Sequence, residues 1–216
     1  GDHRFQHFPW AFFTQQEFHT GRLPWWTSLI QCGFPLLAEG QAGALYPPNW
    51  FFYLLLPIRA AYNYEVLFHY ALGGCLFFAY VRQSGVQRWG AFFATLVYVF
   101  GSAHAGFFYN MTSQRVTAWF PLSLLLIDRL FQNPRLLWAL LLGAVFALES
   151  LAGYQQIAVY AIGFAALYFA GYLFSERRQI SRAAAWRLVT LLGAALGFSF
   201  CSFCRRKYSA YSIPPV

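Results

Sequence analysis

Charged residues are scarce in this chain. Asp, Glu, Lys and Arg make up 10% of its 216 residues, whereas they make up about a quarter of an ordinary soluble domain. Hydrophobic residues account for 59% and aromatic residues for 22%. The composition excludes an ordinary soluble domain, and the lack of a repeat or low-complexity run excludes collagen-like, coiled-coil and disordered chains. The class that remains is an integral membrane protein.

Lysine is almost absent, because Lys207 is the only one and the net charge of +8 comes from arginine. A strongly basic chain can bind nucleic acid. Here no run of basic residues with interleaved aromatic residues offers a groove for it, and the arginines fall between apolar stretches. We therefore interpret the arginines as determinants of membrane topology and exclude nucleic acid as a partner.

Cysteine and methionine are also rare. The four cysteines make no disulfide framework, and the CxxC formed by Cys201 and Cys204 has no second pair or histidine nearby that would complete a metal site. Met111 is the only methionine, and the chain has no signal peptide. We expect an internal piece of a larger protein, with a membrane span before Gly1.

Six stretches approach the roughly 20 apolar residues that a membrane-crossing helix needs. The sequence therefore predicts an all-α, polytopic membrane protein in which residues 63–203 form the transmembrane domain. The third and fourth stretches are short, which indicates tilted crossings or a locally thinned bilayer. The stretches run from Asn63 to Val81, Trp89 to Phe108, Val116 to Phe131, Leu136 to Leu151, Ile157 to Phe174 and Leu188 to Phe203.

The arginines set the expected orientation, because basic residues are retained in short loops on the cytoplasmic side. If the first span runs inward, eight arginines fall in the inner loops and only Arg115 falls in a short outer loop. Residues 1–62 then lie outside the cell. The eight inner arginines are Arg82, Arg88, Arg129, Arg135, Arg177, Arg178, Arg182 and Arg187.

The outer segment is too polar to cross a membrane and too aromatic to stand free in water. Pro9 is placed for a first helical turn and Gly21 for a helix end, which predicts a short interfacial helix between them. From Leu23 to Pro57, repeated proline and glycine predict turns and irregular backbone.

Four phrases resemble the YfhO-like family of bacterial membrane proteins, and the resemblance covers roughly Gly1 to Gly197. It implies the helical architecture of C-type glycosyltransferases, which take a sugar from a polyprenyl-phosphate carrier on the outer face of the plasma membrane. The expected partners are thus the lipid bilayer, a polyprenyl-phosphate-linked sugar and a cell-envelope acceptor. The phrases are GDHRFQHFPW, GRLPWWTSLIQCGFPLLAEGQAGALYPPN, WFPLSLLLIDRL and LESLAGYQQ.

The resemblance implies a catalytic role for Asp2. In C-type glycosyltransferases an acidic residue in the first outer loop acts as base or helps to hold a divalent cation, and Asp2 occupies that place. An acceptor hydroxyl must lose a proton as it attacks the sugar, while the departing phosphate gathers negative charge. The alternative is that Asp2 is a helix cap or a solvated loop residue.

Two histidines near Asp2 suggest ligands for that cation. His3 and His7 are four residues apart, so on a helix they share a face, and Asp2 is close by. The alternative is that both only hydrogen-bond in the headgroup region. Arg4 and Arg115, like Arg22 and Arg59, are able to grip a lipid phosphate or simply to anchor the surface.

Polar residues in two further places are candidates for binding a sugar. A turn-rich stretch of the outer segment displays Glu39, Gln41, Tyr46 and Asn49. Glu149 and Gln155, with Tyr154 and Gln156, lie near the outer ends of the fourth and fifth spans. A carboxylate at that depth is costly, so Glu149 is either functional or paired with an outer arginine.

Three functions are compatible with these features. The first is a glycosyltransferase of C-type architecture, or a degenerate relative. The second is a transporter or flippase, although His69, His104, Asp128 and Glu149 fall towards span ends and leave the midplane without charge. The third is a non-catalytic assembly subunit that docks through its outer segment.

The last residues differ from the rest of the chain. After Gly197 come the only lysine, two of the four cysteines and the basic cluster Arg205–Lys207, which would emerge outside against the positive-inside bias. We expect that residues 198–216, including the tail 204–216, are not native family sequence and contribute no site residues. The alternative is a genuine but divergent tail.

Overall fold

The protein is built from helices. The computed structural model describes residues 3–30, 32–101, 111–175, 186 and 188–197, and every regular element in these ranges is helical. One isolated bridge pairs the backbones of Thr27 and Phe34. The predicted all-α class is therefore confirmed for the described residues, whereas the expectations for the tail fall outside them.

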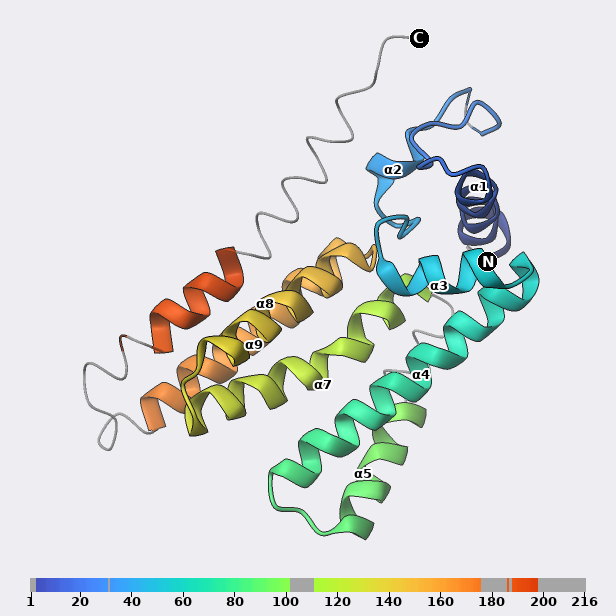
Figure 1. The fold of residues 1–216 in the computed structure, drawn as a ribbon. Helices are drawn as coiled ribbons and strands as arrows, with labels where there is room; N and C mark the ends of the chain where they lie inside the picture. Colours follow the sequence, from blue (N-terminus) through green and yellow to red (C-terminus); the bar gives the residue numbers. More distant parts are fainter. Residues whose placement is uncertain (1–2, 31, 102–110, 176–185, 187, 198–216) are drawn as a thin grey trace.

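A bundle of long helices forms the larger part of the structure (Figure 1). Its members occupy the places of the predicted apolar stretches, although α4 and α7 each begin before the predicted start, at Ile58 and Met111. The helices are α4 (Ile58–Gln83), α5 (Arg88–Phe100), α7 (Met111–Gln132), α8 (Leu136–Leu151), α9 (Gln155–Ser175) and a short helix, Leu188–Gly197.

Two of the described helices, α4 and α9, are long and apolar enough to cross a membrane. Three others, α5, α8 and Leu188–Gly197, are apolar but shorter. The sequence predicted six crossings. Within the described residues, two helices therefore have the length and hydropathy that a membrane crossing requires.

Small residues bring the helices of the bundle close together. A Cβ built on Gly73 of α4 would lie 3.3 Å from Cα of Ala118 in α7. A Cβ on Gly143 of α8 would lie 3.1 Å from the backbone of Ala195. Such contacts are typical of helix packing in membranes, where the backbones approach through small residues.

Pro121 lies inside α7, where it has no N–H to donate to the carbonyl of Thr117 four residues earlier. The hydroxyl of Tyr98 in α5 donates to that carbonyl oxygen at 3.0 Å. The side chain of a neighbouring helix thus replaces the backbone hydrogen bond that proline removes, which is how prolines are tolerated in apolar bundles.

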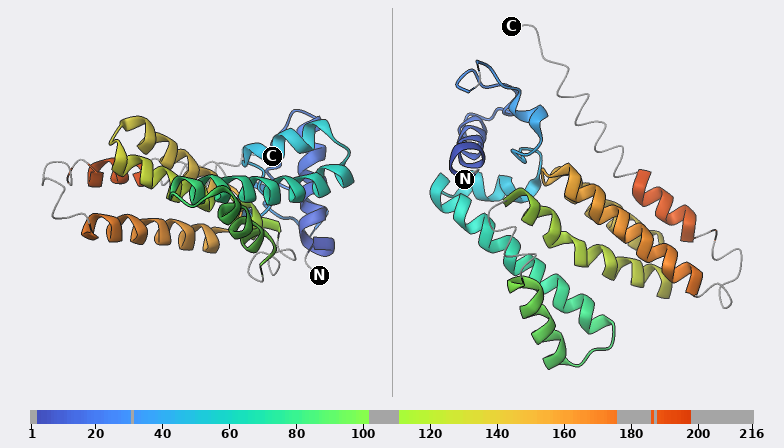
Figure 2. Two further views of the ribbon diagram at one scale, coloured as in Figure 1. Left: turned by 90° about the horizontal axis from the view of Figure 1, so that it is seen from below. Right: turned by 180° about the vertical axis from the view of Figure 1, so that it is seen from behind.

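Residues 3–57 form a second layer, which we call the platform. It contains the π-helix His3–His7, α1 (Phe8–His19), α2 (Leu36–Glu39) and α3 (Pro47–Leu55). As predicted, α1 has Pro9 in its first turn and ends before Gly21, whose φ is +74°. Between Leu23 and Pro57 the predicted turns are present, but the short helices α2 and α3 were not predicted there. The platform lies at one end of the bundle (Figures 1 and 2).

At the other end of the bundle, polar contacts tie three helices together. The Tyr168 hydroxyl of α9 donates to Oδ1 of Asp128 in α7 at 2.7 Å. Gln83, the last residue of α4, accepts from Arg129 and donates to the carbonyl of Leu125. This end of the bundle is therefore fixed by polar groups.

The turn between α8 and α9 packs directly on the platform through Gly153. Its φ is +113°, and a Cβ there would lie 3.0 Å from the carbonyl oxygen of Gly40 and 3.1 Å from Cα of Gln41. The position therefore requires glycine for both its backbone conformation and its surroundings.

We predict that Gly153→Ala lowers the free energy of unfolding by about 1–3 kcal/mol, the usual cost of one strained position. The matched control is Gly163→Ala in α9, where a Cβ would meet nothing within 4 Å. There the better helix former should raise stability by up to ~1 kcal/mol. Thermal unfolding in detergent micelles measures both, and equal effects of the two substitutions would contradict the packing described.

Candidate functional site

The first turn of α7 carries a buried arginine that is paired with a buried glutamate of α4. Nε of Arg115 lies 2.5 Å from Oε1 of Glu65, and the exposed fractions of the two side chains are 4% and 0%. A charge in an apolar interior is tolerated only when it is paired and hydrogen-bonded. The pair therefore fixes α4 and α7 relative to each other.

Tyr53 of α3 closes this pair from the platform side. Its hydroxyl donates to Oε2 of Glu65 at 3.1 Å and accepts from Nη2 of Arg115 at 3.3 Å. Burial raises the pKa of Tyr53 above its ordinary value, so the hydroxyl keeps the proton that it donates. Glu65, Arg115 and Tyr53, which we call the clamp, connect the platform to two helices of the bundle.

A second polar contact lies beside the clamp. Nδ1 of His69 is 2.7 Å from the Glu65 carbonyl oxygen, which can only accept, so Nδ1 carries a hydrogen. In the neutral ring Nε2 then accepts from the hydroxyl of Tyr46 at 2.8 Å. That hydroxyl in turn accepts from Nε1 of Trp119 at 2.6 Å. Each group thus has a partner of the right kind, and the platform is bound to α4 and α7 a second time.

The loop before α3 is shaped to fit over Arg115. Gly43 has φ +63°, and a Cβ built there would lie 2.6 Å from Nη1 of Arg115 and 2.7 Å from Nδ2 of Asn49. Asn49 Nδ2 donates to the Gly43 carbonyl at 2.9 Å, and Arg115 Nη1 approaches the carbonyl of Gln41 at 3.5 Å. The absence of a side chain at Gly43 lets the backbone approach the guanidinium.

The platform helix α1 is held to α3 through one side chain. Nε2 of Gln15 donates to the carbonyl oxygens of Tyr53 at 2.8 Å and Leu56 at 2.7 Å. These carbonyls lie at the end of α3, where a helix leaves its last acceptors without partners. The clamp therefore positions α1 indirectly, through α3.

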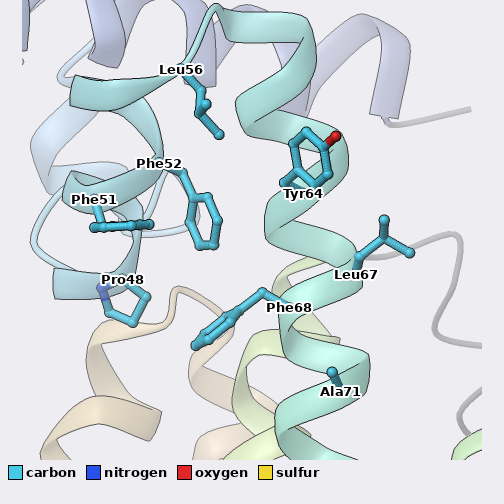
Figure 3. A pocket seen from close by; sticks show the side chains of 8 residues that line it. All are labelled: Pro48, Phe51, Phe52, Leu56, Tyr64, Leu67, Phe68 and Ala71. Atoms are coloured by element: carbon cyan, nitrogen blue, oxygen red, sulfur yellow. The ribbon is translucent and has the colours of Figure 1, made fainter.

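An apolar groove lies between α3 and the first half of α4 (Figure 3). Its volume is about 830 Å³ and it is open along its length. Phe52 and Phe68, which line it, adjoin Tyr53 and His69 in the chain, so the groove and the buried polar contacts occupy neighbouring faces of the same two helices. The lining residues are Pro48, Phe51, Phe52, Leu56, Tyr64, Leu67, Phe68 and Ala71.

The structure places the predicted site residues in different surroundings. Asp2 lies outside the described residues, and His3 and Arg4 belong to the π-helix at the start of the platform. Tyr46 is buried in the contact with His69, and Gln41 lies under Gly153.

Three further candidates are distributed around the platform end. Glu39 ends α2 and is half-buried. Gln155 opens α9 and its Nε2 donates to the Ser150 carbonyl at 2.8 Å. Glu149 is fully buried near the end of α8. Arg115 does not lie at the surface as a lipid anchor would, because Glu65 binds it inside the bundle.

The described residues offer no set of ligands for the expected divalent cation. Of Asp2, His3 and His7, only the His7 side chain is described, and it is buried with its ring against the edge of Trp10. No group of three or more His, Cys, Asp and Glu side chains in the described part of the chain could hold a metal ion.

Sequence reasoning missed Glu65, although the sequence carries a signal for it. Glu65 is a single carboxylate inside a predicted span and lies four residues before His69, so both occupy one face of a helix. Its partner Arg115 is 50 residues away in the chain. No local pattern connects the two, and the fold alone brings them together.

Comparisons with known proteins do not assign the chain to a family. A scan of protein-family models, a search of curated proteins and a search of solved structures each returned no match.

We predict that either Glu65→Leu or Arg115→Met alone lowers the free energy of unfolding by about 3–5 kcal/mol, because each leaves an unpaired buried charge. The double variant should lose clearly less than the sum of the two. A double-mutant cycle measured by thermal unfolding in detergent tests this prediction. Additive losses would show that the two side chains are not coupled.

Proposed function

We propose that the chain is a multi-pass membrane protein. The exposed faces of its helices support this, because large apolar side chains cover them where a water-soluble protein would place polar ones. In α5, for example, Phe93 is 63% and Val97 is 73% exposed, and in α9 Phe164 is 63% exposed. Lipid is the surrounding in which such surfaces are stable.

We infer further that the platform lies on the outer face of a bacterial plasma membrane. Each of the two described turns opposite to it is flanked by two arginines, and basic residues are retained on the cytoplasmic side. Arg82 and Arg88 flank the turn between α4 and α5, and Arg129 and Arg135 flank the turn between α7 and α8.

We propose that the protein transfers a sugar from a polyprenyl-phosphate carrier to a cell-envelope acceptor. The apolar groove is the observation that carries the proposal beyond the sequence resemblance. It is open and lined almost entirely by aromatic and aliphatic side chains, so it suits a prenyl chain rather than a polar ligand. It also begins at the platform, where a lipid headgroup would lie.

In the proposed reaction the acceptor hydroxyl attacks the anomeric carbon of the carrier-bound sugar. Asp2 accepts the hydroxyl proton while the bond between that carbon and the phosphate oxygen breaks, and polyprenyl phosphate leaves with the electron pair. An arginine at the platform would offset the charge that gathers on the phosphate. Arg59, in the first turn of α4, is exposed and begins the helix that forms one wall of the groove.

A non-catalytic assembly subunit is the second candidate function. One observation favours it: the clamp and the contact with His69 use the platform's buried polar groups internally and make the platform a rigid surface. Such a surface suits docking of another envelope protein, and transfer activity would then be absent.

The proposed orientation predicts the accessibility of introduced cysteines. In a variant without the native cysteines, a cysteine in place of Gln179 should react with a membrane-impermeant maleimide only after the cells are opened. A cysteine in place of Arg22, which is largely exposed on the platform, should react in intact cells. Labelling of position 179 from outside would overturn the orientation.

The proposed reaction predicts that Asp2→Asn abolishes sugar transfer, because the amide cannot accept the proton. A loss of about 100-fold or more is the expected size for a general base. The assay follows a radiolabelled sugar from its polyprenyl phosphate to envelope acceptors in membranes that contain the full-length protein. The matched control is Asp128→Asn at the opposite end of the bundle. Unchanged transfer by Asp2→Asn would exclude the role of Asp2, and no transfer by the wild type would favour the assembly subunit.

A further inference from the structure

Glu149 is a buried carboxyl group without a partner. It lies near the end of α8 that meets the platform, its exposed fraction is 0%, and neither Oε1 nor Oε2 has a hydrogen-bond partner in the structure. An unsatisfied buried polar group is costly, and a carboxyl group is among the most costly. A bundle without a use for such a group would gain stability from leucine at this position.

Gln114 of α7 is in the same condition. Its exposed fraction is 1%, and both the amide oxygen and the amide nitrogen are without a partner. An amide usually finds at least one partner when it is buried, and each exception calls for an explanation. Gln114 immediately precedes the clamp residue Arg115.

The two side chains belong to the same end of the bundle. Val116 of α7 and Ala152, the residue that follows α8, share one apolar cluster, which places the platform ends of the two helices together. The Tyr98 hydroxyl, which hydrogen-bonds to α7 at Thr117, also lies within electrostatic reach of the Glu149 carboxyl. Glu149 and Gln114 are thus two buried side chains without hydrogen-bond partners at the same end of neighbouring helices.

The neighbouring polar groups cannot satisfy them because they have other partners. Arg115, the buried cation of this region, is bound to Glu65 and Tyr53. The Ser150 hydroxyl donates to the carbonyl of Phe146. No described residue therefore supplies the missing hydrogen bonds.

We propose that Glu149 and Gln114 form a binding site for the hydroxyl groups of a sugar. A sugar hydroxyl both donates and accepts, so it can donate to the carboxyl group and to the Gln114 oxygen and accept from the Gln114 nitrogen. A divalent cation fits less well, because it takes about six oxygen ligands and several carboxylates. The site deepens the proposed function, and it rests on that proposal for its assignment to the transferred sugar or its acceptor.

The site is closed in this structure. The turn at Gly153 that follows Glu149 packs on Gly40 and Gln41 of the platform, so a ligand that enters from the platform side passes this contact. The proposal therefore requires this contact to open, and the experiment below measures whether a reagent reaches Glu149.

Labelling with dicyclohexylcarbodiimide tests whether the proposed site at Glu149 can be reached and whether a ligand occupies it. This apolar reagent attacks protonated carboxyl groups: the carboxyl oxygen bonds to the carbodiimide carbon, the proton passes to nitrogen, and rearrangement leaves a stable N-acylurea that peptide mass spectrometry detects. The full chain is treated in two micelles with the same dodecyl tail. One headgroup is maltoside, which is rich in hydroxyls, and the other is a polyoxyethylene ether, which has hardly any.

We expect Glu149 to be modified in the ether micelles. In maltoside the modification should be roughly tenfold less, because about one net hydrogen bond to the maltose headgroup changes the occupancy of the site by that factor. Glu65, which is paired with Arg115, serves as the internal control and should stay unmodified in both. Protection by maltoside should disappear in Gln114→Met. No modification of Glu149, or equal modification in both micelles, would overturn the proposal.

A stability measurement distinguishes the site from a structural role. Glu149→Met should unfold at a temperature at least as high as the wild type, whereas a structural carboxyl would make the variant less stable. A lower unfolding temperature would contradict the proposal even if Gln114→Met does not fold. None of these measurements includes a transfer step. The proposed sugar site can therefore be wrong while the sugar-transfer assay succeeds, and it can be right while that assay fails.

Discussion

One buried guanidinium organises the end of the bundle at which the platform lies. Arg115 lies near the start of α7 inside an apolar interior, and such a charge requires an anion and further acceptors around it. Glu65 supplies the anion from α4, Tyr53 supplies a hydroxyl from α3, and the backbone at Gly43 approaches because no side chain intervenes. Three segments that are distant in the sequence therefore have only one arrangement in which the charge is satisfied.

The shape of the platform follows from this constraint. Tyr53 fixes α3 on the bundle, and the two bonds of Gln15 fix α1 on α3. With α3 held by its polar side, its apolar side faces α4 and forms the groove. The same contacts that satisfy Arg115 thus produce the feature on which the proposed binding of a lipid-linked sugar depends. Glu149 and Gln114 lie outside this network of contacts, and they are the side chains that we propose bind a sugar.

Local features of the sequence predicted the local features of the fold. Pro9 and Gly21 marked the ends of α1 because a helix begins and ends through its own residues, and apolar runs marked the helices of the bundle. The early starts of α4 and α7 were not predicted. In α7 the reason is that residues 112–115 are polar and look like a loop, yet they continue the helix because they are buried against other segments.

The candidate site was predicted less completely than the fold. The sequence indicated Tyr46, Gln41, Arg115 and Glu149, and the structure places all four at the platform end of the bundle. It gave no means of pairing Arg115 with Glu65, since ion pairs across 50 residues depend on the tertiary fold. The catalytic role of Asp2, the orientation and the six crossings stay predictions.

Hydrogen–deuterium exchange tests the role of the clamp most directly, because it measures separately how firmly the platform and the bundle are held. The chain is compared with Arg115→Met in the same lipid nanodiscs. Backbone amides of residues 41–56 should exchange much faster in the variant, while amides in the middle of α9 keep their protection. Equal exchange of residues 41–56 in both proteins would contradict the claim that Arg115 holds the platform on the bundle.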